Sequence, residues 1–293
     1  MRVVILGAAG QLGSDLRRLL PVAAGGPADE VIGLAHADLD VTDDGAVRAT
    51  LGRLQPQAVI NTTAYHRVDE CEGEATRAFA VNAVAVRRLA ETCRELGAKL
   101  VHVSTDYVFG GRARSPRVET DRPDPQSVYA TSKLAGEHLV RGAGGRHFVI
   151  RTCGLYGLAG ASGKGGNFVE TMLRLAREGR PIRVVADQVC TPTSTAELAR
   201  VIGRLLPTEA YGLYHVTNDG QCSWYEFAER IFTLVDLRPD LAPTTTAAFG
   251  ARAPRPAYSV LRNARLQALG LDDLSPWPDA LRDYLRAKGH LSA

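Results

Sequence analysis

The first half of the chain alternates short apolar runs with segments of helical periodicity. The apolar runs have no polar face, which is typical of strands that are buried on both sides in a parallel sheet. They are Val3–Leu6, Glu30–Leu34, Ala58–Asn61, Leu100–Ser104 and Phe148–Arg151. The helical stretches between them are Gln11–Leu20, Asp43–Leu54, Thr76–Leu96 and Ser127–Arg141. This alternation predicts an α/β fold with a doubly wound parallel sheet of the Rossmann type.

A glycine-rich turn follows the first predicted strand directly and opens the first helix. Its sequence is Gly7-Ala8-Ala9-Gly10-Gln11-Leu12-Gly13. Gly7 and Gly10 would let the chain turn sharply and bring backbone N–H groups close to a pyrophosphate, while Gly13 would let the helix pack tightly. A tight strand–helix turn needs no ligand, but at the first strand of an α/β chain this pattern favours dinucleotide binding.

The choice between NAD and NADP is normally visible at the end of the second strand. An acidic residue there binds the ribose hydroxyls, and an arginine accepts the extra phosphate. The chain has Leu34-Ala35-His36-Ala37, which supplies neither. Asp38 and Asp40 are better placed to border the adenine pocket. NADPH and NADH therefore both stay open, and the lack of a repelling carboxylate favours NADPH.

The pattern changes after residue 153. Gly154 to Gly166 is rich in glycine and has no period, so a lid over a ligand and a surface loop are equal interpretations. A helix at Phe168–Glu178, a strand at Ile182–Val185 and a helix at Ser194–Leu206 follow. We expect residues 1–153 to form a dinucleotide-binding domain, to which later segments return. Residues 154–293 mainly form a smaller, discontinuous α/β substrate domain.

Three residues suggest acid–base chemistry at the ligand crevice. Tyr129 and Lys133 are four residues apart on one predicted helix, so both side chains lie on the same face. A nearby ammonium would lower the pKa of the phenol, which could then protonate an alkoxide. Thr105 directly follows a strand, where parallel sheets present their ligand crevice, and its hydroxyl could polarise a carbonyl. The adjacent Asp106 could orient a catalytic group or simply cap a backbone N–H.

Composition excludes several other classes of protein. The 293 residues carry a formal charge of +3 without a basic run, which argues against nucleic-acid binding. No apolar stretch reaches the roughly 20 residues of a membrane span, and a strand that begins at residue 3 leaves no room for a signal peptide. Five widely spaced cysteines indicate reduced thiols and a cytoplasmic location. The seven histidines have no metal-binding spacing, so we expect no metal site.

The glycine spacing, the strand-end hydroxyl and the Tyr129/Lys133 pair resemble the extended short-chain dehydrogenase/reductase family. The resemblance extends to the dTDP-4-dehydrorhamnose reductase group and covers almost the whole chain. The most specific matching strings are Ser104-Thr105-Asp106-Tyr107-Val108-Phe109 and Ser223-Trp224-Tyr225-Glu226-Phe227-Ala228. Further matches are Leu39–Asp43, Val59–Tyr65 with Val68-Asp69, Tyr129–Glu137, Asn167–Val169, Asp187-Gln188 with Pro192-Thr193, and Arg255-Pro256.

This resemblance implies an NAD(P)H-dependent reductase acting on C4 of a dTDP-linked 4-keto-6-deoxy sugar. Tyr129 would donate the proton, Lys133 would hold the nicotinamide ribose, and Thr105 would bind the reacting oxygen. The substrate would also contact Val68, Asp106, Tyr107, Asn167 and Arg255, the last two at the diphosphate. The cofactor would contact Gly7, Gly10, Gln11, Leu12, Gly13, Asp40, Val41, Asn61, Thr62, Thr63, Ala64, Tyr65, Ser104, Tyr129 and Lys133. We expect no nucleic-acid or membrane partner, and a homodimer stays open.

Three positions depart from the pattern of the group. Gly154 stands where a tryptophan is usual near the sugar, which predicts a roomier pocket and leaves the identity of the sugar open. Cys190 replaces a glycine, and Tyr258 replaces a small polar residue. Trp224, Tyr225 and Phe227 could stack on thymine, although the core is the favoured place for such a cluster.

Two other functions use the same scaffold. An epimerase or dehydratase would retain its cofactor tightly, but a dehydratase of this family usually has a glutamate where Tyr107 stands. A non-catalytic, NADP-binding regulatory subunit, like that of methionine adenosyltransferase, is the other alternative. The intact set of Thr105, Tyr129 and Lys133 argues against it.

Overall fold

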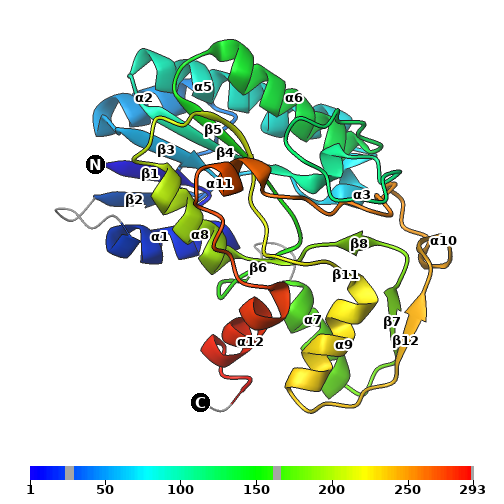
Figure 1. Ribbon diagram of the computed structural model, residues 1–293. Coiled ribbons are helices and arrows are strands. Elements are labelled where there is room, and N and C mark those ends of the chain that lie inside the picture. The colour runs from blue at the N-terminus through cyan, green and yellow to red at the C-terminus, as the bar shows by residue number, and fades with distance from the viewer. Residues whose placement is uncertain (24–29, 161–165, 292–293) are drawn as a thin grey trace.

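The central sheet is parallel and has six strands in the order β10-β5-β4-β3-β1-β2 (Figure 1). The computed structural model describes residues 1–23, 30–160 and 166–291. The strands are β1 (Val3–Leu6), β2 (Val31–Leu34), β3 (Ala58–Asn61), β4 (Lys99–Thr105), β5 (His147–Thr152) and β10 (Gly212–His215). The strand order reverses between β1 and β3, and ligands of doubly wound sheets bind at such a switch point. The predicted fold class is confirmed.

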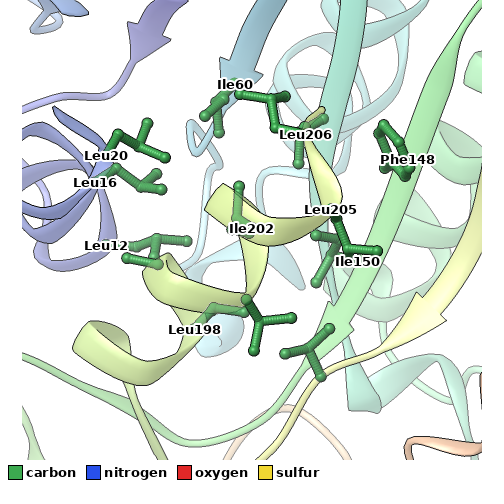
Figure 2. Packing of buried hydrophobic residues seen from close by; sticks show 14 of the residues in the cluster. Leu12, Leu16, Leu20, Ile60, Phe148, Ile150, Leu198, Ile202, Leu205 and Leu206 are labelled. Carbon is green, nitrogen blue, oxygen red and sulfur yellow. The ribbon is translucent and has the colours of Figure 1, made fainter. Parts of the chain in front are cut away.

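Helices cover both faces of this sheet, which explains why its strands have no polar side. On one face α1 (Gln11–Ala23) and α8 (Thr195–Leu205) pack their leucines onto β3 and β5, as Figure 2 shows. On the other face lie α2 (Asp44–Leu54), α5 (Ala85–Glu95) and α6 (Val128–Ala143). The two clusters of buried side chains hold the ends of the strands in place, because close-packed interiors resist displacement.

The second half of the chain contributes to both parts of the molecule. β10 pairs with β5 in the main sheet, so the chain does return to the first unit. A second group of elements lies below the sheet in Figure 1, around its own core of Tyr156, Phe227 and Ile231. This group contains α7 (Phe168–Arg177), α9 (Trp224–Leu234), α12 (Trp277–Ala287) and the parallel pair β7 (Ile182–Val185) and β12 (Leu241–Thr244).

Shorter elements connect these parts. They are β6 (Leu155–Tyr156), β8 (Val189–Cys190), β9 (Thr193–Ser194), β11 (Cys222–Ser223), α3 (Val68–Cys71), η2 (Asp106–Val108), α10 (Thr246–Phe249) and α11 (Ala264–Ala268). All five cysteines are buried. Within the described ranges no helix is long and apolar enough to cross a membrane.

The helix predicted over Thr76–Leu96 is wrong in one respect. The structure has α4 (Ala75–Phe79), a π-helical turn η1 (Ala80–Val84) and then α5. Asn82 lies in the π-turn and is fully buried. Its amide accepts a hydrogen bond from Tyr65 N at 2.9 Å and donates to Tyr65 O at 3.0 Å and to Ser132 Oγ at 3.0 Å. Such bulges are frequent at functional sites, and this one fixes the loop after β3.

Candidate active site

A cavity of about 940 Å³ runs along the carboxyl ends of the strands, between the sheet and the second group of elements. The glycine turn after β1 lines one end of it. The ends of β4 and β5 and the start of α9 line the other end. Because parallel strands all end at this edge, the fold gathers the predicted residues from distant parts of the sequence.

The glycine turn has the shape that a pyrophosphate requires. Gly7 has φ +81°, and a Cβ there would lie 2.6 Å from Thr62 Oγ1. A Cβ at Gly13 would collide with Gly7 O, so this glycine allows α1 to start against the turn, although Gly13 itself does not line the cavity. Gly10 has no left-handed φ and lines the cavity with Gln11. The first N–H groups of α1 lack helical partners and favour an anion.

Basic side chains gather at the end of the cavity that the loop after β2 lines. Asp40 and Val41 line this end, and two hydrogen bonds from Thr42 lower the pKa of the Asp40 carboxyl. His36 and Arg77 also line this end. Arg77 lies over the ring of Tyr65, 4.8 Å from its centroid. Nothing in the sequence pattern indicated Arg77, because it comes from α4 and not from the end of β2.

The loop after β3 lines the middle of the cavity with Thr62, Thr63, Ala64 and Tyr65. Asn61, which we expected to contact the cofactor, is buried beneath this loop and is outside the lining. Its Oδ1 accepts hydrogen bonds from Thr63 N at 3.1 Å and Thr63 Oγ1 at 2.6 Å. Asn61 is therefore a positioning residue.

Tyr129, Thr105 and Lys133 meet in the cavity. The Ser127 hydroxyl accepts a hydrogen bond from Ala130 N and fixes the start of α6, so the Tyr129 phenol reaches Thr105 and forms a hydrogen bond with it. Lys133 lies one turn further along α6, and its Nζ donates to Val103 O at 2.6 Å. The three residues that the sequence singled out are thus brought together.

Burial controls the protonation of this group. It raises the pKa of Tyr129 above its ordinary value, and the hydrogen bond between Tyr129 and Thr105 only partly opposes this. The sequence predicts that Lys133 lowers the pKa of this phenol, whereas the largest effect of the packed structure is desolvation, which raises it. The phenol therefore keeps its proton at neutral pH, as a proton donor must. Burial lowers the pKa of Lys133 to about 8, with Glu137 acting in the opposite direction.

The pKa of Lys133 gives a prediction about pH. Lys133 loses its charge as pH rises through about 8, so a cation that would hold the cofactor ribose is lost above that value. We expect kcat/KM for the nicotinamide cofactor to fall above about pH 8, since this parameter reports the free enzyme. Lys133→Arg keeps its charge to high pH. A falling limb that persists unchanged in Lys133→Arg would contradict the assignment to Lys133.

A buried ion pair anchors α6, the helix that carries Tyr129 and Lys133. Arg151 Nη2 lies 2.7 Å from Glu137 Oε2, and both side chains are almost wholly buried. Ser104, which lines the cavity as predicted, donates through Oγ to Glu137 Oε1 at 2.5 Å. Glu137 is four residues after Lys133, so the pair joins the ends of β4 and β5 to the catalytic face of α6.

Asp106 orients Thr105. Its carboxylate is buried, which raises its pKa. It accepts hydrogen bonds from Thr105 Oγ1 at 3.1 Å, from Cys153 Sγ at 3.1 Å and from the Ser259 hydroxyl. The carboxylate also accepts a hydrogen bond from a backbone N–H, so these contacts agree with both of the roles considered for Asp106. Ser259 carried no signal in the sequence, because its partner is more than a hundred residues away.

The predicted substrate residues divide into two groups. Val68, Tyr107 and Asn167 line the cavity. The Asn167 amide, however, caps α7 and donates to Gly157 O at 3.1 Å and Tyr284 Oη at 3.0 Å. Arg255 is outside the lining and pairs with Asp69, with Nη2 2.7 Å from Oδ2. The structure does not bring it to the cavity as a free cation.

Several lining residues were not assigned a role from the sequence. Gln188 belongs to a string that matched the family, and Cys153 directly precedes Gly154, which is one of the three departures noted above. Phe168 and Trp224 form an aromatic pair at the far end, 4.8 Å between ring centroids. Phe227 is in the core, as favoured, while Trp224 contacts both the core and the cavity. In residues 1–23, 30–160 and 166–291, no three His, Cys, Asp or Glu side chains form a metal-binding group.

The sheet, the glycine turn and the Thr105/Tyr129/Lys133 set define a nucleotide-binding protein of the extended short-chain dehydrogenase/reductase class. The family model described as the RmlD substrate binding domain matches residues 1–289. The chain therefore belongs to the RmlD family, the group of the dTDP-4-dehydrorhamnose reductases.

Individual relatives agree with this assignment. The chain is 40% identical to the spore coat polysaccharide biosynthesis protein SpsK of Bacillus subtilis, over 98% of each chain. It is 43% identical to a probable dTDP-4,6-dihydroxy-2-methyloxan-3-one 4-ketoreductase of Streptomyces antibioticus, over 97% of this chain and 94% of the relative. A crystal structure of dTDP-4-dehydrorhamnose reductase from Bacillus anthracis in complex with NADP has a TM-score of 0.91 at 37% identity, covering 98% of this chain and 99% of that one.

Proposed function

We propose that this protein is an NAD(P)H-dependent reductase of the C4 ketone of a dTDP-4-dehydro-6-deoxy sugar. One observation carries the proposal: the Tyr129 phenol is hydrogen-bonded to the strand-end hydroxyl of Thr105, in a cavity that the glycine turn after β1 also lines. The names of the Streptomyces and Bacillus anthracis relatives support the substrate class. Such a reaction belongs to deoxysugar biosynthesis.

The residues act on the carbonyl in defined ways. When bound, the reduced nicotinamide supplies the hydride that C4 receives. Thr105 donates a hydrogen bond to the carbonyl oxygen, and Tyr129 transfers its proton to that oxygen as the negative charge develops. The Tyr129 phenolate that is left gains from the Lys133 cation on the same helix face. Before the ketone binds, the Thr105 hydroxyl donates to Asp106, and its single proton turns from that carboxylate to the carbonyl oxygen when the ketone is bound.

The structure fits either nicotinamide cofactor and favours NADPH. Gly7 has the left-handed backbone and the close approach to Thr62 that a pyrophosphate turn needs. His36 and Arg77 line the adenine end and would attract a 2′-phosphate. The NADP complex of the Bacillus anthracis relative supports the same choice.

The test of the function is a coupled assay. The dTDP-4-dehydro-6-deoxy-L-hexose is generated in place, and loss of reduced-nicotinamide absorbance is followed with NADPH and with NADH. We expect substrate-dependent oxidation that is faster with NADPH. Purified protein that retains its nucleotide and consumes none with the ketosugar would instead indicate an epimerase. Binding of nucleotide without any turnover on differently configured 4-ketosugars would indicate the regulatory function.

Three further parts of the proposal concern the whole chain. Residues 1–153, with β10 and α8, hold the cofactor, and residues 154–293 mainly hold the sugar nucleotide. We also propose a cytoplasmic location, which the free thiols of Cys93, Cys153, Cys190 and Cys222 support, because thiols stay reduced there. The third part is the homodimer that the sequence left open, and light scattering at several concentrations measures directly whether the 31.4 kDa chain forms it.

A further inference from the structure

The indole of Trp224 is held rigidly at one end of the cavity. Trp224 is the first residue of α9, whose start is fixed by a capping box between Ser223 and Glu226. Its backbone N–H donates to Gln188 O at 3.3 Å, and its ring packs on Phe168 of α7. A side chain that is fixed in this way offers a pre-formed aromatic surface, because little freedom is lost when a ligand binds it.

The position of Gly154 shows where the Cη2 edge of this indole lies. A Cβ at Gly154 would be 3.3 Å from Trp224 Cη2 and 3.2 Å from Pro192 Cα. The indole edge therefore approaches the backbone at Gly154. The preceding residue, Cys153, bonds to Asp106, which holds Thr105. The aromatic surface is thus beside the group that would bind the reacting carbonyl.

We propose that Trp224 is a specificity-determining residue that contacts the deoxyhexose ring of the sugar nucleotide. The hexose carries the reacting ketone, so it must lie at Thr105 and Tyr129, while the base lies beyond the diphosphate. The C–H groups of a 6-deoxyhexose suit an aromatic wall, and the hydroxyls and phenol of the catalytic group fix the opposite, polar side. This inference rests on the proposed function.

The chain has two tryptophans, which makes the contact measurable without turnover. Trp277 packs on Phe227, 5.7 Å between ring centroids, and does not line the cavity. In Trp277→Phe all tryptophan emission comes from Trp224. We expect a saturable change of this emission with dTDP-L-rhamnose and a much smaller one with dTDP, with calorimetry recording the binding of both.

The outcomes separate the two proposals. Equal changes of the tryptophan emission with dTDP and with dTDP-L-rhamnose would show that the indole contacts the thymine base and not the hexose, and would overturn the inference. So would calorimetric binding without any change in emission. If neither nucleotide binds, the proposed function fails, and this inference fails with it.

Kinetics provide a second measurement. Trp224→Phe keeps an aromatic ring against Phe168, but the smaller ring does not extend to Gly154. We expect KM for the sugar nucleotide to rise about tenfold, with KM for NADPH unchanged. Trp277→Phe is the matched control and should leave both values unchanged. An unchanged sugar-nucleotide KM in Trp224→Phe would overturn the inference.

Gly154→Ala tests the same contact from the other side. Gly154 has φ +53°, and the added methyl would press on the indole, so KM for the sugar nucleotide should rise. Gly179 has φ +65° with nothing within 4 Å of its Cβ position. Gly179→Ala therefore carries the backbone strain without the contact, and its KM should stay at the wild-type value. Equal behaviour of the two variants would contradict the proposed contact.

Discussion

Replacing Tyr129 with phenylalanine is expected to lower kcat by about 10²–10⁴-fold with the 4-ketosugar. The substitution removes the proton that the carbonyl oxygen must receive. It leaves the aromatic ring in place, with its centroid 6.1 Å from that of the Tyr107 ring. Burial raises the pKa of this phenol and favours its protonated form, so the loss falls on the chemical step. The KM for the cofactor should change little, since the glycine turn and Lys133 are intact.

Tyr211→Phe is the matched control for this experiment. Tyr211 is outside the cavity, and its hydroxyl is buried without a hydrogen-bond partner. Removing that oxygen should leave kcat at the wild-type value. A Tyr129→Phe variant that keeps a tenth or more of the activity would show that another group donates the proton, because the expected factor is at least about a hundred.

The largest effect on stability is expected at the buried pair of Arg151 and Glu137. Arg151→Met leaves the Glu137 carboxylate buried without its cation, at a cost of about 3–5 kcal/mol in the free energy of unfolding. Three hydrogen bonds from the guanidinium to this carboxylate are lost together. Urea denaturation measures the change as a shift of the midpoint at constant slope.

A surface pair serves as the comparison. Arg183 and Asp240 form an ion pair with both side chains largely exposed. Arg183→Met should cost about 1 kcal/mol or less, because water screens such pairs. The double variant Arg151→Met/Glu137→Met should recover much of the lost stability, since it leaves no unpaired charge. If Arg151→Met proves as mild as Arg183→Met, the support assigned to this pair is wrong.

The fold follows from the sequence because its strands are uniformly apolar. Val3–Leu6 and Ala58–Asn61 are bounded in the structure as predicted, since burial on both faces leaves a clear pattern. The π-turn at Ala80–Val84 could not be predicted in this way. We attribute it to the amide of Asn82, which forms hydrogen bonds with Tyr65 and Ser132 in other parts of the chain. The spacing of apolar residues along one segment does not show which distant residues that segment will contact.

The site was predicted where local spacing determines it. Tyr129 and Lys133 share a helix face, and Gly7 and Gly13 are needed by the backbone itself. Arg255 shows the limit of this reasoning. A guanidinium suits a phosphate, but its partner here is Asp69, 186 positions earlier in the chain. The pKa of Tyr129 shows another limit, because burial depends on the packed structure and reverses the expected direction.

Deuterium transfer tests the central claim most directly. NADPH labelled with deuterium at the transferred position is incubated with the protein and the dTDP-4-dehydro-6-deoxy-L-hexose, and the product is analysed by mass spectrometry and NMR. The account predicts one deuterium, located at C4 of the hexose, for each NADPH consumed. A product without deuterium, or ketosugar left unreduced while the nucleotide is bound, would contradict it.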